Sequence, residues 1–304
     1  MYTKILVPLD GSPRSEGILP YTRSLAEACK IPVELLHVIE PQIIATFSDP
    51  AHARYADVVE ADMRRNGLAY LKTVAASLPG AAAVRCAVHV GNPAEVIVDS
   101  ASGQAGTLIT MSTHGRSGIQ RWLIGSVADK VLRGTTSHLL LARTNDGPKS
   151  NEKASLKTVI VPLDGSGLAE AALPAVVFLA KKMGLEIVLV RAFISPSSAL
   201  YATDEYVPNL VELTEQARRE VKGYLDGKVQ QLQAEGLSRV SYVLVEGQAA
   251  AEIIELAHKT PANLLAMSTH GRSGVGRWVL GSVTDRVVRY SGDAVLVIPP
   301  PKDK

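Results

Sequence analysis

The residues Lys4-Ile-Leu-Val-Pro-Leu-Asp-Gly-Ser12 return as Thr158-Val-Ile-Val-Pro-Leu-Asp-Gly-Ser166, with six of nine positions identical. A second pair of stretches, Met111 to Arg133 and Met267 to Arg289, shares 16 of 23 residues without a gap. The two offsets are 154 and 156 residues, so the repeat has the length of a domain and is too long for a solenoid unit. The chain therefore consists of two copies of one unit.

Each copy alternates short apolar runs with longer amphipathic stretches, a pattern that predicts βαβ units and a parallel sheet. The strands expected in the first copy are Ile5–Leu9, Val33–Val38, Val84–Val90, Leu108–Met111 and His138–Ala142. The helices expected between them are Ser15–Cys29, Val58–Ser77, Ala94–Ala101 and Ser126–Arg133. The later strands of the second copy are expected at Ile187–Ala192, Val240–Val245, Leu264–Met267 and Ala294–Ile298. Each copy is thus predicted to be a five-stranded α/β domain.

A polar segment rich in turn-forming residues, Thr144 to Lys153, separates the copies. We predict one domain over residues 1–144, a linker over 145–156 and a second domain over 157–304.

The composition excludes several classes of protein. The 304 residues are 46% hydrophobic and 20% charged, as in ordinary globular proteins. The apolar runs are far shorter than the ~20 residues of a membrane span. No signal peptide is recognised, and two cysteines are too few for a disulfide framework. The net charge is only +2 without a basic run, which argues against a nucleic-acid partner. We expect a cytoplasmic protein that does not bind membranes.

The repeated residues follow the first and fourth strands, where a doubly wound sheet binds its ligand. Asp10 and Asp164 stand at the carboxyl end of the first strand, and an acid there can accept hydrogen bonds from ribose hydroxyls. The Pro-Leu pair before each Asp, and the residue that ends the second strand (Val38 or Ala192), are expected to form apolar walls for a base. Alternatively, Asp10-Gly-Ser12 serves only as an Asx turn or a helix N-cap.

The loop after the fourth strand is rich in glycine, which leaves backbone N–H groups open to an anion. Gly125-Ser126 lies at an expected helix start, where the helix dipole favours phosphate. Arg116 or Arg121 could pair with the charge of the anion. Together these features predict a polyphosphate site. His114 is interpreted as a hydrogen-bond donor of the loop rather than a catalyst.

Other nucleotide and hydrolase motifs are absent from the sequence. It contains no G-x-x-x-x-G-K-[ST] and no G-x-G-x-x-G after the first strand. Neither zinc-ligand spacing nor the G-x-S-x-G elbow occurs. A P-loop NTPase, a dinucleotide-binding domain, a zinc protein and an α/β-hydrolase are therefore disfavoured.

At these residues the chain resembles the universal stress protein family, specifically its tandem-domain members. The resemblance covers nearly the whole chain and rests on V-P-L-D-G-S and on a loop close to G-x2-G-x9-G-[ST]. The first glycine of that loop is replaced by Ser112 and Ser268, and a serine can itself donate a hydrogen bond. The resemblance implies two tandem Rossmann-like (adenine nucleotide alpha hydrolase-like) domains. Each would hold a five-stranded parallel sheet of order 3-2-1-4-5, sandwiched by helices.

The resemblance also implies ATP, ADP or AMP as ligand, with Mg²⁺ or Mn²⁺ bound through the phosphates. Position by position, the methionine that ends strand four lies beside adenine, and the glycines with the Ser-Val pair that follows hold the phosphates. The candidate nucleotide-binding residues of the first copy are Pro8, Leu9, Asp10, Val38, Met111, Ser112, His114, Gly115, Arg116, Gly118, Gly125, Ser126 and Val127. Those of the second are Pro162, Leu163, Asp164, Ala192, Met267, Ser268, His270, Gly271, Arg272, Gly274, Gly281, Ser282 and Val283. No residue is predicted to be catalytic or to bind metal directly.

Family members often pair through their fifth strands, so the resemblance implies a pseudo-symmetric contact between the two repeats and is compatible with a homodimer. We favour an ATP-binding regulatory protein of the stress response without strong catalysis. The alternatives are a slow ATPase or nucleotidyl transferase, using Asp10, Ser12 and His114, and a ligand-free scaffold whose loops serve folding alone. The copies differ at Val38 and Ala192 and at Gln120 and Gly276, so we expect their affinities for nucleotide to differ, and the sequence leaves open whether both copies bind it.

Overall fold

A computed structural model of the chain describes residues 1–42, 44, 56–113, 124–143, 152–194, 210–269 and 280–300. The chain divides into two compact units, Met1–Ser155 and Leu156–Lys304. Each unit is an α/β domain, as the repeat predicts, and each is described by itself below.

The first unit contains a parallel sheet with the strand order β3-β2-β1-β4-β5. Its strands are β1 (Lys4–Pro8), β2 (Val33–Ile39), β3 (Val84–Val90), β4 (Thr107–Ser112) and β5 (His138–Ala142). The expected order 3-2-1-4-5 is therefore confirmed, and the expected strand limits differ from the observed ones by at most one residue.

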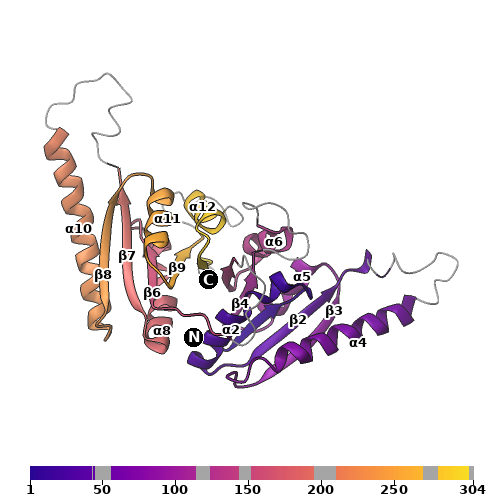
Figure 1. The fold of residues 1–304 in the computed structure, drawn as a ribbon. Helices are drawn as coiled ribbons and strands as arrows, with labels where there is room; N and C mark the ends of the chain where they lie inside the picture. The colour runs from indigo at the N-terminus through magenta and orange to yellow at the C-terminus, as the bar shows by residue number, and fades with distance from the viewer. Residues whose placement is uncertain are drawn as a thin grey trace. The chain divides into compact units, whose positions relative to one another are not determined.

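Helices cover both faces of this sheet. They are α1 (Pro13–Glu16), α2 (Leu19–Cys29), α4 (Ala56–Ala75), α5 (Pro93–Ser102) and α6 (Ser126–Gly134). Helix α4 packs on β2 and β3, whereas α5 packs on β2, β4 and α6 (Figure 1). Because β1 to β3 run in one direction across the sheet and β3 to β5 in the other, right-handed crossovers place α2 and α4 on one face and α5 and α6 on the opposite face.

The second unit repeats this arrangement with the order β8-β7-β6-β9-β10. Its strands are β6 (Thr158–Pro162), β7 (Glu186–Phe193), β8 (Val240–Glu246), β9 (Asn263–Ser268) and β10 (Ala294–Ile298). Its helices are α7 (Gly167–Glu170), α8 (Leu173–Met183), α10 (Leu210–Ala234), α11 (Ala249–Lys259) and α12 (Ser282–Tyr290).

The first helix of each unit is broken, whereas the sequence pattern predicts one continuous helix over Ser15–Cys29. In the first unit α1 ends at Glu16 and α2 begins at Leu19, followed by Pro20. Proline has no N–H to donate to the preceding turn, which favours a new helix start at this point. The second unit has the same break, with Pro174 at the start of α8. The continuous-helix prediction was therefore wrong.

The central strands form the core of each sheet. Ile5, Leu6 and Val7 of β1 have no exposed surface, and every residue of β4 is buried. Helices on both faces exclude water from these strands, which explains their continuous apolar runs. The adjacent carboxyl ends of β1 and β4 are the point where the chain reverses its direction across the sheet.

A tight turn leads from β1 into α1. Gly11 has φ +83° and its counterpart Gly165 has φ +87°, in the left-handed region that favours glycine. Ser12 caps α1 through its Oγ, which accepts a hydrogen bond from the Ser15 N–H at 3.1 Å. The turn therefore fixes how the chain leaves the sheet at the reversal point.

We predict that Gly11→Ala lowers the free energy of unfolding by about 1 kcal/mol, because a β-carbon is strained at positive φ. Gly103→Ala is the matched control, since Gly103 has φ −63° and an added β-carbon there would lie 3.6 Å from the nearest atom. Urea unfolding of both variants checks this. Equal losses in the two variants would contradict the role assigned to the turn.

Candidate functional site

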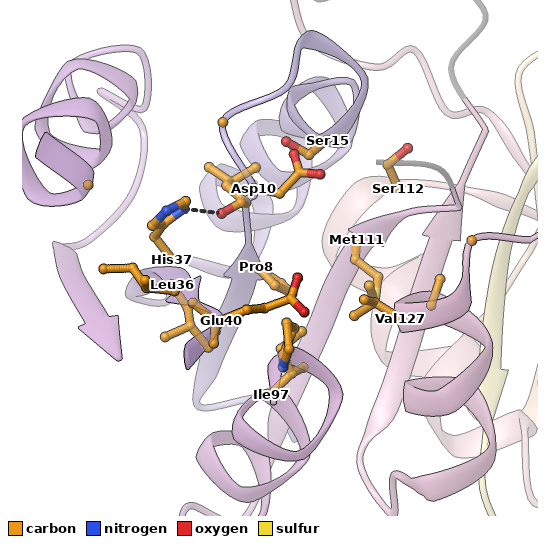
Figure 2. Close-up of a pocket in the computed structure, with 18 of the residues that line it drawn as sticks. Pro8, Asp10, Ser15, Leu36, His37, Glu40, Ile97, Met111, Ser112 and Val127 are labelled. Carbon is orange, nitrogen blue, oxygen red and sulfur yellow. Dashed lines mark hydrogen bonds between the residues drawn. The ribbon is translucent and has the colours of Figure 1, made fainter. Parts of the chain in front are cut away.

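A cavity of about 620 Å³ lies in the first unit, beyond the carboxyl ends of β1, β2 and β4. Figure 2 shows Leu36 and His37 on one side of the cavity and Met111 and Val127 on the other, with Asp10 and Ser15 at one end and Glu40 and Ile97 at the opposite end. Its volume falls in the range of about 300–1,000 Å³ that is usual for small-molecule sites. The cavity occupies the position where a doubly wound sheet binds ligand.

The nine predicted site residues of the first copy that the structure describes all line this cavity. They are Pro8, Leu9, Asp10, Val38, Met111, Ser112, Gly125, Ser126 and Val127. The glycine-loop residues His114, Gly115, Arg116 and Gly118, and their counterparts His270, Gly271, Arg272 and Gly274, lie outside the described residues. Their predicted roles stay predictions.

Sequence reasoning missed the wall that α4 provides. Met63, Asn66, Gly67 and Tyr70 of this helix line the cavity. Their spacing of three and four residues places them on one helix face, which was a usable signal. That spacing alone cannot tell a face that borders a cavity from one that packs on the sheet. His37, Glu40 and Ile97 also line the cavity and were not predicted.

The carboxylate of Asp10 is oriented by the turn that follows it. Its Oδ1 accepts hydrogen bonds from the Ser12 N–H at 2.9 Å and the Ser12 Oγ at 2.6 Å. The second unit has the same pair of contacts between Asp164 and Ser166, at 2.8 and 2.6 Å. The Asx turn and the N-cap that the sequence allowed as an alternative are therefore both present. They hold the carboxylate at the rim of the cavity.

The side walls of the cavity are mainly apolar. Pro8 and Val38 come from the ends of β1 and β2, Met111 from the end of β4, and Ile97 and Val127 from α5 and α6 (Figure 2). Met111 and Ile97 are almost completely buried. Such walls provide a binding slot for a flat apolar group such as a nucleobase.

The N-terminus of α6 also borders the cavity, where the sequence predicted a helix start. Gly125 is the N-cap residue, and because it has no side chain it leaves the first N–H groups of the helix uncapped. Its own N–H donates to the Thr113 carbonyl at 2.7 Å. Asp129 is the first residue whose N–H donates within the helix, to the carbonyl of Gly125 at 2.9 Å. The N–H groups of Ser126 and Val127 therefore have no acceptor within the helix and add to its positive end. This arrangement suits an anion.

Two hydrogen bonds hold the side of the cavity that is formed by His37 of β2 and Tyr70 of α4. His37 Nδ1 lies 2.8 Å from the Leu9 carbonyl, and because a carbonyl only accepts, Nδ1 is the protonated nitrogen. Tyr70 donates its hydroxyl to Glu16 at 2.9 Å. Burial, and then the neighbouring Glu16, raise the pKa of Tyr70 well above 10.0. Tyr70 therefore remains a neutral donor at physiological pH.

In the second unit the described counterparts lie at the same places in the fold. Pro162, Leu163 and Asp164 end β6 or follow it, and Ala192 lies in β7. Met267 and Ser268 end β9, while Gly281 caps α12, which begins with Ser282 and Val283. The sequence repeat is therefore a structural repeat.

The described residues show neither a metal cluster nor a membrane-spanning helix. They contain no cluster of three or more His, Cys, Asp or Glu side chains able to hold a metal ion. None of the helices within them is both long and apolar enough to cross a bilayer.

Comparison with known proteins identifies relatives for the whole chain. A sequence model described as "Universal stress protein family" matches residues 1–143 and again 155–299. A universal stress protein of Mycolicibacterium smegmatis is 23% identical over 304 residues, covering 97% of both chains. One of Methanocaldococcus jannaschii is 31% identical over 147 residues, covering 48% of this chain and 84% of its own length.

Solved structures give the same result for the fold. The crystal structure of a universal stress protein from Archaeoglobus fulgidus aligns with a TM-score of 0.70 and 21% identity. The alignment covers 97% of this chain and 98% of that one. A solved structure thus shares this fold over nearly the whole of both chains.

We predict that Tyr70→Phe leaves the tyrosinate absorbance of the native protein at pH 10.0 unchanged. An ordinary tyrosine is half ionised at that pH, whereas the raised pKa keeps Tyr70 protonated. In urea Tyr70 titrates normally, so there the variant loses one of nine tyrosine signals. A loss of this signal in the native protein would contradict the assignment.

The sign of the linkage follows from the raised pKa. The stability that Tyr70 contributes is fully present below pH 10.0 and declines as pH rises towards its folded-state pKa.

Proposed function

The chain belongs to the universal stress protein family, and on that premise we propose that its first unit binds an adenine nucleotide, ATP, in the cavity beyond β1, β2 and β4. The chain would act as a regulatory protein of the stress response. The presence or absence of bound nucleotide would be the signal that it passes to its partners. The observation that carries the proposal is that three kinds of chemical group line one cavity. Apolar side chains, an oriented carboxylate and a helix N-terminus are the groups that would bind the base, the ribose and the phosphates of ATP.

The apolar slot is the proposed base site. Pro8, Val38 and Met111 line the cavity from β1, β2 and β4, and their apolar side chains can pack against a planar ring. Burial of a purine there would contribute about 25 cal/mol per Å² of apolar surface removed from water. This term accounts for affinity for a base but does not by itself select adenine.

Asp10 is the proposed ribose contact. A carboxylate accepts hydrogen bonds from vicinal hydroxyl groups, and a charged acceptor strengthens them. The two contacts from Ser12 hold Asp10 in one orientation, so little further ordering is needed when a sugar binds. Preorganisation of this kind raises affinity by lowering the entropic cost of binding.

The N-terminus of α6 is the proposed phosphate site. Ser126 and Val127 line the cavity and belong to the first turn of the helix. The loop residues His114, Gly115, Arg116 and Gly118 are proposed as additional phosphate contacts. Mg²⁺ or Mn²⁺ would be held mainly by the phosphates of the nucleotide and would neutralise part of their charge. The homodimer likewise remains a prediction.

We predict that Asp10→Ala weakens ATP binding about tenfold or more, because a charge-assisted hydrogen bond contributes ~1.5–3 kcal/mol. Isothermal titration calorimetry of protein freed of nucleotide measures this. Asp99→Ala is the control: it removes the same charge from an exposed position on α5 that does not line the cavity. An unchanged affinity in Asp10→Ala would refute the ribose contact. Failure of the wild type to bind ATP, ADP or AMP would refute the function.

We predict that Ser126→Glu weakens ATP binding about tenfold but leaves adenosine binding unchanged. Negative charge in the first turn of α6 opposes the phosphates, while adenosine carries none. Adenosine and ATP titrations of the same variant form an internal control. Equal weakening of both ligands would place the phosphates elsewhere.

A further inference from the structure

The two units can be compared position by position around their sites. Tyr70 donates to Glu16 at 2.9 Å, and Tyr224 donates to Glu170 at 2.8 Å. The two residues of the second pair each lie 154 positions after their counterparts in the first. The turn at Asp164 contains the same hydrogen bond from serine to aspartate as the turn at Asp10. The Tyr–Glu pair and the Asp turn are therefore the same in both units. Side chains that differ between the two sites can then explain a difference in ligand binding.

The first difference is at His37, whose counterpart is Arg191. The Cζ of Arg191 lies 4.8 Å from the centroid of the Tyr224 ring, a cation–π contact. Its Nη1 is only 3.0 Å from the position that a β-carbon on Gly165 would occupy. The guanidinium of Arg191 thus lies against the turn at Gly165 in the second unit. The equivalent turn of the first unit, at Gly11, borders the cavity.

The second difference is at Gly67, whose counterpart is Val221. Gly67 lines the cavity, and a β-carbon there would lie 3.0 Å from Cδ2 of His37. Val221 carries a whole isopropyl group at the equivalent position of α10 and is 8% exposed. At these two positions the second unit therefore carries larger side chains, Arg191 and Val221, than the His37 and Gly67 of the first unit.

The third difference is the charge around the Tyr–Glu pair that occurs in both units. Lys228 replaces the buried Val74, and its Nζ lies 2.7 Å from Glu170 and 5.7 Å from the Tyr224 ring. The second unit thus places two cations, those of Lys228 and Arg191, beside Tyr224. In the first unit the acids among the described lining residues are Asp10 and Glu40. Ligand entry into the second site would have to displace an internally satisfied cluster.

We propose that Arg191 and Val221 occupy the second site themselves, so that each chain binds one nucleotide, in its first unit. This inference rests on the proposed function. It assigns Arg191 and Val221, and their counterparts His37 and Gly67, as the residues that decide which copy accepts a ligand.

Calorimetric titration with ATP tests the number of sites. The wild type is expected to bind one ATP per chain, and Asp10→Ala is expected to weaken the whole binding signal. A stoichiometry of two, or a normal site remaining in Asp10→Ala, overturns the inference while leaving the proposed function intact. Absence of ATP binding in every protein overturns the proposed function itself.

Exchange of the deciding residues tests the cause. Arg191→His combined with Val221→Gly is expected to raise the stoichiometry to two, and His37→Arg combined with Gly67→Val to abolish binding. Circular dichroism and urea midpoints establish that each variant is folded. A folded Arg191→His/Val221→Gly variant that still binds one ATP overturns the assignment of these residues.

Photolabelling of the wild type gives a measurement that does not depend on any variant. After irradiation with 8-azido-ATP, labelled peptides identified by mass spectrometry are expected from residues 1–155. Excess ATP should suppress this labelling. Competable labelling of peptides from residues 156–304 overturns the inference.

Discussion

The single hand of the connections between parallel strands determines where this protein can have a site. With the order β3-β2-β1-β4-β5, right-handed crossovers send α2 and α4 to one face of the sheet and α5 and α6 to the other. The chain leaves β1 and β4 in opposite directions, so a crevice forms beyond their adjacent ends. The turn that carries Asp10 and the N-terminus of α6 both border this crevice. The second unit has the same topology.

Structural and functional interpretations of the turn after β1 are compatible with each other. Gly11 provides the positive φ, and Ser12 both caps α1 and holds Asp10. A turn of this kind is sufficient for folding, and it also presents an oriented carboxylate to the cavity. The matching turn in the second unit, next to Arg191, illustrates the point, because the same backbone geometry persists where the surrounding side chains differ.

Much of the fold and part of the site could be predicted from the sequence. Strand limits, the helix start at Ser126 and the position of Asp10 follow from local patterns that hydrogen bonding within a few residues enforces. The break between α1 and α2 was missed because the apolar periodicity continues through it, although Pro20 was a signal. The contribution of α4 was missed because the pairing of Gly67 with His37 joins residues far apart in the chain.

By itself, the sequence determined that the chain is one domain used twice, that each domain is a parallel α/β sheet, and which residues follow its central strands. Only the tertiary structure decided that the residues from β1, β2, β4, α4 and α6 surround one cavity. It also decided that Arg191 lies over Tyr224 and against Gly165 in the other copy. The physical reason is that repeats and turns are encoded by neighbouring residues. Open space, in contrast, depends on the volumes of side chains that packing brings together from distant segments.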